Sequence, residues 1–174
     1  MTKDSPSSEE PFGIATLPVA DGGRLGLCPL PGGAGALETD IETIAAWRPD
    51  LVVTLTESSE MQAGGVARLA AAFAAREIDW CHFPIRDYHG PDGDRKTLWP
   101  QLAARIHSLL DADGSVLVHC RGGKGRSGMI LLRILMERGE PEADALARLR
   151  RTRPGAVETD GQLAWAVQGT RPPG

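Results

Sequence analysis

The chain contains the stretch His119-Cys120-Arg121-Gly122-Gly123-Lys124-Gly125-Arg126-Ser127-Gly128. Five residues, three of them glycine, separate the cysteine from the arginine. An apolar segment at 115–119 leads into the stretch and predicts a strand, and an apolar segment that begins near Arg126 predicts a helix. Glycines let successive backbone N–H groups turn inward onto an anion, and the helix N-terminus adds further donors and a positive dipole. The stretch therefore predicts a phosphate-binding loop with a nucleophile at its base.

Different residues of this loop are expected to have different roles in binding and attacking a phosphate. Cys120 is the candidate nucleophile, because a positive field favours its reactive thiolate form. Arg126 can hold two phosphate oxygens at once through its planar guanidinium group. A plain turn after a buried cysteine is the alternative, but it leaves Arg126 and Ser127 at the start of the helix unexplained. The candidate phosphate-binding residues are Arg121, Gly122, Gly123, Lys124, Gly125 and Arg126.

The composition of the 174 residues narrows the class of protein. The net charge is −4 at pH 7, so no general basic field indicates nucleic acid as a partner. No clustered histidines and carboxylates indicate a metal site, and we expect neither metal nor cofactor. Three cysteines are too few for a disulfide framework, which favours a reducing, cytoplasmic location. The sequence has no secretory signal and no segment apolar enough to span a membrane, so we expect no stable membrane association.

Strands and helices alternate along the sequence, and this order predicts the fold class. We expect residues 13–170 to form a single α/β domain with a central, mostly parallel sheet flanked by helices, and residues 1–12 to form a disordered tail. Apolar periodicity predicts a helix at 97–111. The phosphate-binding loop then lies between a central strand and a buried helix, at the carboxyl end of the strand, where open α/β sheets bind ligands.

A thiolate that attacks phosphorus needs an acid to protonate the departing oxygen. Three aspartates, Asp87, Asp92 and Asp94, lie in a segment predicted to be a loop at 85–96. Asp87 is nearest to the end of the preceding strand, so its position is the best defined of the three. Asp92 and Asp94 flank a glycine and are typical of a turn. A turn or cap role for Asp87 itself stays open.

The loop resembles the signature of cysteine-dependent protein tyrosine phosphatases, which is His-Cys, five residues, Arg, and Ser or Thr. Residues 23–162 are similar to dual-specificity phosphatases of the cyclin-dependent-kinase-inhibitor type, the kinase-associated phosphatases. Besides the loop, the similarity rests on residues 25–32, 84–92 and 155–162. The resemblance implies a protein tyrosine phosphatase-like fold.

The resemblance also implies roles for four residues around the loop. Asp87 matches the general acid, and His119 would order the loop and hold the thiolate. Ser127 would hydrogen-bond the cysteine as it leaves, and Gln162 would position water for hydrolysis. From the residues alone, Ser127 is also a simple helix cap, and Gln162 is also the third residue of a capping box that begins at Thr159.

The expected activity is hydrolysis of phosphomonoesters, namely phosphotyrosine or phosphoserine and phosphothreonine in proteins, through a cysteinyl-phosphate intermediate and without an obligate partner. Arg121 and Lys124 depart from the kinase-associated type and resemble the loop of tensin-homologue phosphatases. Phosphoinositide or inositol-phosphate substrates are therefore an alternative. A sulfurtransferase, an arsenate reductase and an inactive phosphate-binding module are further alternatives. A disulfide from Cys28 or Cys81 to Cys120 stays open.

Overall fold

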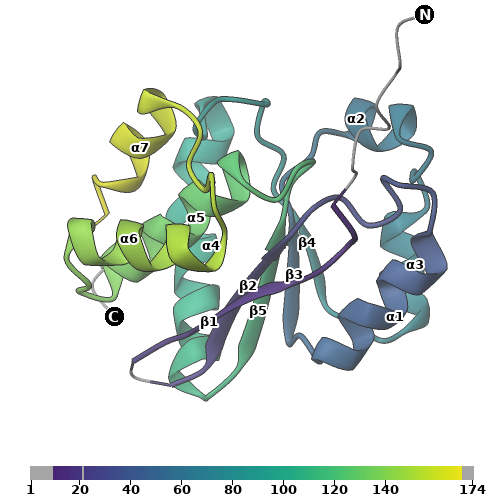
Figure 1. Cartoon of the computed structure of the whole chain (residues 1–174), viewed down its shortest axis with the longest axis horizontal. Coiled ribbons are helices and arrows are strands. Elements are labelled where there is room, and N and C mark those ends of the chain that lie inside the picture. Colours follow the sequence, from purple (N-terminus) through teal and green to yellow (C-terminus); the bar gives the residue numbers. More distant parts are fainter. Residues whose placement is uncertain (1–9, 21, 170–174) are drawn as a thin grey trace, which may run out of the picture.

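A five-stranded sheet runs through the middle of the molecule (Figure 1). The computed structural model describes residues 10–20 and 22–169. The strands lie in the order β1-β2-β5-β3-β4. β1 pairs with β2 antiparallel, whereas the β2–β5, β5–β3 and β3–β4 pairs are parallel, so the expected single α/β domain with a mostly parallel sheet is confirmed. The strands are β1 (Ala15–Pro18), β2 (Arg24–Cys28), β3 (Leu51–Thr54), β4 (Trp80–His82) and β5 (Ser115–His119).

Helices cover both faces of this sheet (Figure 1). One face carries α4 (Gly93–Asp111), α5 (Gly125–Glu137), α6 (Glu142–Thr152) and α7 (Asp160–Ala166). The other face carries α1 (Leu37–Trp47) and α3 (Leu69–Ala75). The short helix α2 (Ser58–Ala63) follows the carboxyl end of β3. No helix in the described part of the chain is both long and apolar enough to cross a membrane.

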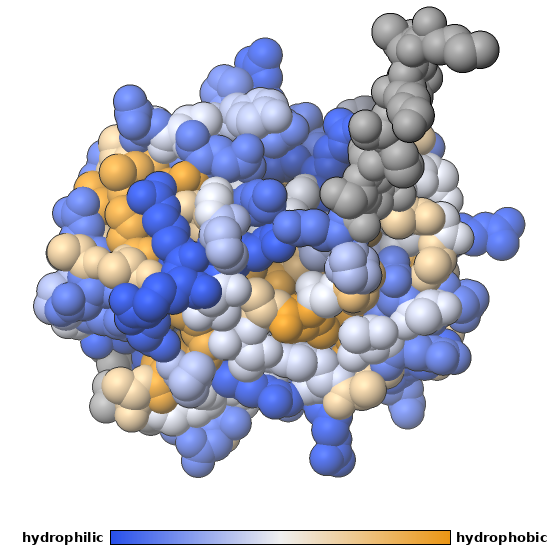
Figure 2. All heavy atoms as spheres, viewed as in Figure 1, coloured by the Kyte–Doolittle hydropathy of each residue, from blue (hydrophilic) through white to orange (hydrophobic). Residues whose placement is uncertain are grey.

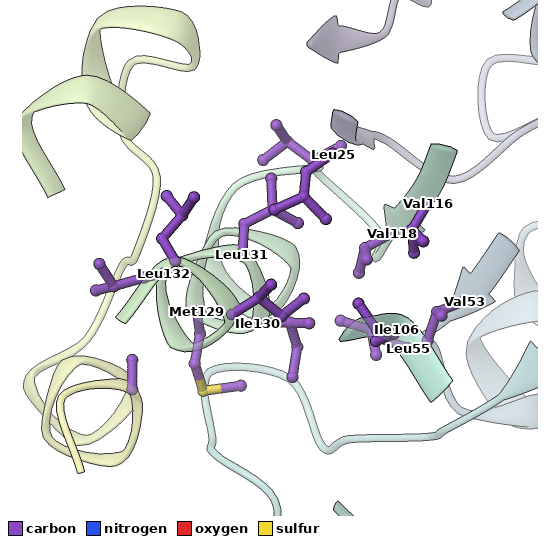
Figure 3. Close-up of a cluster of buried hydrophobic side chains, with 14 of the residues drawn as sticks. Leu25, Val53, Leu55, Ile106, Val116, Val118, Met129, Ile130, Leu131 and Leu132 are labelled. Carbon is purple, nitrogen blue, oxygen red and sulfur yellow. The ribbon is translucent and has the colours of Figure 1, made fainter. Parts of the chain in front are cut away.

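The helix that follows the phosphate-binding loop, α5, is buried in the larger core. Met129, Ile130, Leu131 and Leu132 are all withdrawn from solvent. Figure 3 shows their side chains among residues from β2, β3, β5 and α4, such as Leu25. The expected buried helix is therefore confirmed, and the loop ends at a helix that cannot shift without disturbing the core.

The strand that leads into the loop, β5, is held between two cores. Val116 and Val118 belong to the larger core, whereas Leu117 belongs to the smaller core beneath α1 and α3. This division follows from the alternation of side chains along a strand. Because both faces of β5 are packed and both its edges are paired, the residue after it, Cys120, has a fixed position.

Two elements differ from the sequence-based expectations. Helix α4 begins at Gly93, within the segment expected to be a loop, because Asp94 suits the positive N-terminal turn although the apolar repeat begins only at Leu98. Helix α2 was not predicted, since six residues are too few to show a helical repeat. Its capping box starts at Glu57, which is outside the usual Ser, Thr, Asp and Asn set.

The structure describes only the last residues of the expected N-terminal tail. Residues 1–9 of that tail, and residue 170, lie outside the described residues. Phe12, near its end, packs against the smaller core. Figure 2 shows that hydrophilic side chains cover most of one face of the molecule and that apolar side chains appear there in smaller patches.

Candidate active site

The carbonyl groups of the loop after β5 are tied outward by residues from elsewhere in the chain. The N–H of Leu30 donates to the carbonyl of Arg121 at 3.0 Å. The guanidinium group of Arg153 donates from Nη2 to the carbonyl of Gly122 at 3.0 Å and from Nε to that of Gly123 at 3.1 Å. Three successive peptide groups therefore have their oxygens fixed on the outer side of the loop.

The fourth peptide group of the loop is held in the same way. The carbonyl of Lys124 accepts from the N–H of Val157 at 3.1 Å and from the N–H of Gly128 at 3.0 Å. The described residues contain no cis peptide bond, and a trans peptide points its C=O and N–H in opposite directions. With the oxygens of residues 121–124 outward, the N–H groups of residues 122–125 point inward. This is the backbone arrangement that an anion cradle requires, and the binding of phosphate by these residues stays a prediction.

Gly123 is the glycine that this geometry requires most strictly. Its φ is +68°, in the left-handed region. A Cβ at this position would lie 2.6 Å from the carbonyl carbon of Cys28 and 2.6 Å from the nitrogen of Pro29. The loop thus packs backbone to backbone against the end of β2, and a side chain at residue 123 would push the two segments apart.

Cys120 lies at the base of this loop and is 3% exposed. Its Sγ is 3.3 Å from the hydroxyl oxygen of Ser127, in the first turn of α5. A cavity of about 700 Å³ opens above it, and a neighbouring hollow of about 610 Å³ shares two lining residues with that cavity. The residues that line the cavity are Glu10, Asp87, Tyr88, Cys120, Arg121, Gly122, Lys124, Arg153 and Glu158.

The guanidinium group of Arg126 is buried, with 1% of the residue exposed. Nη1 and Nη2 each lie 2.7 Å from a carboxylate oxygen of Glu60, and Nη1 also donates to the carbonyl of Ile85 at 3.0 Å. Nε has no hydrogen-bond partner among the described residues. A buried, unused donor beside an anion cradle is free to bind a phosphate oxygen.

Glu60, like Arg153, is a residue around the loop that sequence reasoning missed. Burial favours its neutral form, but hydrogen bonds from Arg126 and from the N–H of Glu57 hold the pKa of Glu60 below its ordinary value. Burial likewise opposes the charge of Arg126, yet the hydrogen bonds to Glu60 raise the pKa of Arg126 above its ordinary value. Both partners therefore stay charged, and the arginine is oriented before any ligand arrives.

Asp87 is the one of the three candidate aspartates that lines the cavity with Cys120. Its side chain is 40% exposed, and its Oδ1 lies 3.3 Å from Nη2 of Arg126. The same oxygen accepts from the N–H of Tyr88 at 2.9 Å. Asp92 is instead the N-cap of α4, and Asp94 lies in the first turn of that helix.

His119 belongs to a hydrogen-bonded chain that fixes its tautomer. The indole N–H of Trp80 donates to the hydroxyl of Thr54 at 2.8 Å, and that hydroxyl lies 2.6 Å from Nε2 of His119. Because a carbonyl oxygen only accepts, Nδ1 carries the ring proton and donates to the carbonyl of Cys120 at 3.2 Å, and in a neutral ring Nε2 then accepts from the hydroxyl of Thr54. Burial lowers the pKa of His119 to about 4, so the ring is neutral and orders the loop without adding charge.

Gln162 acts as a helix cap and also faces the loop. Its Oε1 accepts from the N–H groups of Glu158 and Thr159 at 3.0 and 3.2 Å, which completes the expected capping box. Its buried Nε2 has no partner among the described residues and lies 3.2 Å from where a Cβ on Gly125 would be. This free donor is compatible with a role in holding water, which stays a prediction.

The other two cysteines are free thiols, as is Cys120. Burial raises the pKa of Cys28 well above its ordinary value and also raises that of Cys81. Both therefore remain protonated and poorly nucleophilic at neutral pH. Cys120 is the cysteine that the loop places beside a cation and a set of inward N–H groups.

We predict that Arg153→Ala weakens the cradle. Without the guanidinium group, the carbonyls of Gly122 and Gly123 lose their outer partners and the inward N–H groups lose their fixed direction. The affinity for vanadate or inorganic phosphate, measured by titration calorimetry, should fall roughly 5- to 30-fold, or about 1–2 kcal/mol. Arg151→Ala, which removes an exposed arginine from the end of α6, should leave the affinity unchanged. Equal affinities in all three proteins would contradict this role.

We predict that His119 makes the fold less stable in acid. Its pKa is about 4 in the folded protein and about 6.5 in the unfolded chain, so the unfolded state binds more protons between these values. The free energy of unfolding should therefore decrease as pH falls from 6.5 to 4, by up to about 1.4 kcal/mol per pH unit from this residue.

Urea unfolding between pH 7 and pH 4.5 measures this slope. His119→Asn keeps a donor for the carbonyl of Cys120 but cannot be protonated, so its slope should be shallower than that of the wild type. The exposed His89, changed to Asn, serves as the control and should retain the wild-type slope. If His119→Asn also retains it, the buried neutral histidine is not the cause.

Comparison with known proteins places this geometry in a family. A family model described as "Swiss Army Knife protein, DSP-PTPase phosphatase domain" (PTP-SAK) matches residues 32–164. That span includes Glu60, Asp87, the loop and Gln162. "Putative tyrosine phosphatase 067L" of Invertebrate iridescent virus 3 is 31% identical over 100 residues, which are 53% of this chain and 41% of the viral protein. The chain thus matches less than half the length of that viral relative.

Two solved structures are similar in fold. Kinase-associated phosphatase (KAP), with its catalytic cysteine replaced by serine, has a TM-score of 0.78 at 23% identity and covers 91% of this chain and 94% of that chain. Tk-PTP in its active form has a TM-score of 0.67 at 27% identity and covers 88% of this chain and 96% of that chain. With the family match over residues 32–164, more than half of the sequence, the chain belongs to the dual-specificity protein tyrosine phosphatase domains of the PTP-SAK type.

Proposed function

We propose that this phosphatase hydrolyses phosphomonoesters in proteins, at phosphotyrosine and at phosphoserine or phosphothreonine, through a cysteinyl-phosphate intermediate. The observation that carries the proposal is the meeting of three groups at the loop after β5. Cys120 and Asp87 line the same cavity, and Arg126, whose Nη2 lies 3.3 Å from Oδ1 of Asp87, keeps an unused Nε. A nucleophile, an oxyanion site and an acid are the parts that such a reaction needs.

In the first step, the thiolate of Cys120 attacks phosphorus, a P–S bond forms and the P–O bond to the substrate breaks. Asp87 gives its proton to the departing oxygen, so that the leaving group departs as a neutral alcohol or phenol. Arg126 and the inward N–H groups of residues 122–125 hold the non-bridging oxygens, whose charge they stabilise without rearrangement.

In the second step, water attacks the phosphorus of the intermediate and the P–S bond breaks. The Asp87 carboxylate formed in the first step takes the proton of that water. The hydroxyl of Ser127, 3.3 Å from Sγ, hydrogen-bonds the thiolate as it leaves. In this proposal the Nε2 of Gln162, which has no partner among the described residues, holds the attacking water. Phosphate is released and the resting thiolate is restored.

The mechanism predicts that Cys120→Ser abolishes turnover of a small aryl phosphate while phosphate binding is retained. Serine cannot form the thiolate, but the cradle and Arg126 remain. Wild-type protein should hydrolyse the substrate in the presence of a chelator and be inhibited by vanadate. Activity is followed by release of the coloured phenol, and binding by calorimetry. Full activity of the serine variant would contradict the covalent mechanism.

The assignment of Asp87 as the acid predicts a loss that depends on the leaving group. Asp87→Asn should lower kcat about 10²- to 10⁴-fold for a phosphate ester with a poor leaving group, and much less for an aryl phosphate with an acidic phenol. Asp92→Asn is the matched control, because Asp92 makes no side-chain cap hydrogen bond in α4. The assignment is wrong if Asp92→Asn shows this leaving-group dependence and Asp87→Asn does not.

Multiply phosphorylated substrates, including phosphoinositides, are the second candidate. The observation in their favour is that three basic residues, Arg121, Lys124 and Arg153, line the cavity, together with the acidic residues Glu10, Asp87 and Glu158. Glu10 also lines it and pairs with Nη1 of Arg153 at 2.9 Å, so this rim already binds one carboxylate. A second phosphate on the substrate fits the same charges.

This candidate predicts that the loss of rim charge acts on one class of substrate. The double change Arg121→Gln and Lys124→Gln should raise KM for a substrate with several phosphates, and salt should reduce the wild-type preference for it. A small aryl phosphate should be barely affected, because it has no second charge. The double variant Arg68→Gln and Lys96→Gln removes the same charge elsewhere and is the control. Equal losses on both substrates would remove the support for this candidate.

A further inference from the structure

The hollow of about 610 Å³ beside the cavity above Cys120 differs from that cavity in chemical character. The two adjoin, because Glu10 and Arg121 line both. Charged side chains make up most of the wall of the cavity. Much of the wall of the hollow is apolar, and its apolar residues are Phe12, Pro29, Leu30, Ala34 and Ala63. The hollow can therefore cover apolar surface that the charged cavity cannot.

Asp40 is a carboxylate in the wall of this hollow, and it is only 5% exposed. Its Oδ2 accepts from the N–H of Gly32 at 2.8 Å, and it has no ion-pair partner among the described residues. It lies in the first turn of α1, where the helix dipole favours a negative charge. A carboxylate can accept about four hydrogen bonds, and a buried charge is costly without a partner. Asp40 thus has acceptor capacity left for a cation.

The other two acidic residues in the wall already have cationic partners. Glu60 accepts from both terminal nitrogens of Arg126, and Glu10 pairs with Arg153 at 2.9 Å. Arg121, the basic residue in the wall, is exposed and lies where the hollow meets the cavity. Three acidic residues against one basic residue give the hollow an excess of negative charge.

A long basic side chain combines the two properties that this hollow matches. Lysine and arginine carry a charged end on an apolar stem, and the stem is commonly buried along apolar surface. Here the apolar wall suits the stem and Asp40 suits the charged end. A peptide whose phosphate binds above Cys120 would bring a neighbouring side chain to the adjoining hollow, since the two share part of their wall.

We propose that the hollow is a subsite for a lysine or arginine next to the phosphorylated residue, and that Asp40 recognises the cation. The inference rests on the proposed phosphatase activity and adds a substrate class to it, namely phosphopeptides with a basic neighbour. An apolar neighbour would use the wall alone. An acidic neighbour, or a second phosphate, would be repelled from the hollow.

The test compares kcat/KM for phosphotyrosine peptides that differ in one neighbouring residue, which is lysine, leucine, glutamate or alanine, placed in turn before and after the phosphotyrosine. At one of these positions lysine should exceed leucine by at least about 5-fold, which is the most that an exposed ion pair gives. Glutamate should fall below alanine there. A small aryl phosphate, which does not reach the hollow, is measured alongside.

Two variants change the hollow in different ways. Asp40→Asn keeps an acceptor oxygen for the N–H of Gly32 but removes the charge, so the advantage of lysine over leucine should fall below about 2-fold. Ala34→Phe narrows the hollow from an exposed position and should lower the values for both the lysine and the leucine peptide. Neither change should alter turnover of the aryl phosphate by more than about 2-fold.

Glu42→Gln is the matched control for Asp40→Asn. It removes the same charge from an exposed position of the same helix, outside the wall of the hollow, and should keep the preference for lysine. If Asp40→Asn does not fold, as its melting curve would show, Ala34→Phe decides, and it must then remove the preference for lysine.

Four outcomes overturn the inference and leave phosphatase activity intact. They are no advantage of lysine over leucine at any position, an advantage that survives in Asp40→Asn, an equal loss of it in Glu42→Gln, and turnover of the aryl phosphate without turnover of any peptide. A wild-type protein that hydrolyses neither the peptides nor the aryl phosphate fails the proposed function, and the inference falls with it.

Discussion

The guanidinium group of Arg126 has to remain charged although it is almost fully withdrawn from water, and much of the site follows from that requirement. An unpaired buried charge would cost several kcal/mol. Glu60 accepts from both terminal nitrogens, Ile85 supplies a carbonyl and Asp87 lies 3.3 Å from Nη2, which leaves Nε without a partner among the described residues. The ion pair therefore does more than neutralise a charge. It also holds the guanidinium group, and with it the unused Nε–H, in one orientation.

The peptide groups of the loop are also oriented before a ligand binds, and the groups that hydrogen-bond their carbonyl oxygens come from distant parts of the chain. Leu30 follows β2, Arg153 follows α6 and Val157 precedes α7. None of them needs to touch a substrate. By holding carbonyl oxygens outward they direct N–H groups inward, so the stabilisation of an anion requires no movement when it binds. Residues far from the chemistry thus determine how well the cradle works.

The difference between the loop itself and the distant residues that hold it explains what could be predicted from the sequence. The loop, β5 and α5 are continuous in the chain, and their glycine spacing and apolar runs showed both the fold class and the place of Cys120 and Arg126. Glu60 and Arg153 lie 66 residues and about 30 residues from their partners in the loop. Their helices show no local pattern that marks the contact. Asp87 is intermediate, since the end of β4 fixed its position but only the cavity shows that it reaches the site.

Around Cys120, one residue fixes the position of the backbone and another carries the positive charge. His119 adjoins the nucleophile in sequence and is neutral, since burial holds its pKa near 4 and Thr54 donates to its Nε2. It fixes the backbone carbonyl of Cys120 without attracting the thiolate electrostatically. In the proposed mechanism the positive charge and dipoles around Cys120 come instead from Arg126, the inward N–H groups and the helix terminus. A protonated histidine would add charge to the site, but in this buried position it would lose the acceptor nitrogen that completes the chain from Trp80 and so loosen the strand that carries the nucleophile.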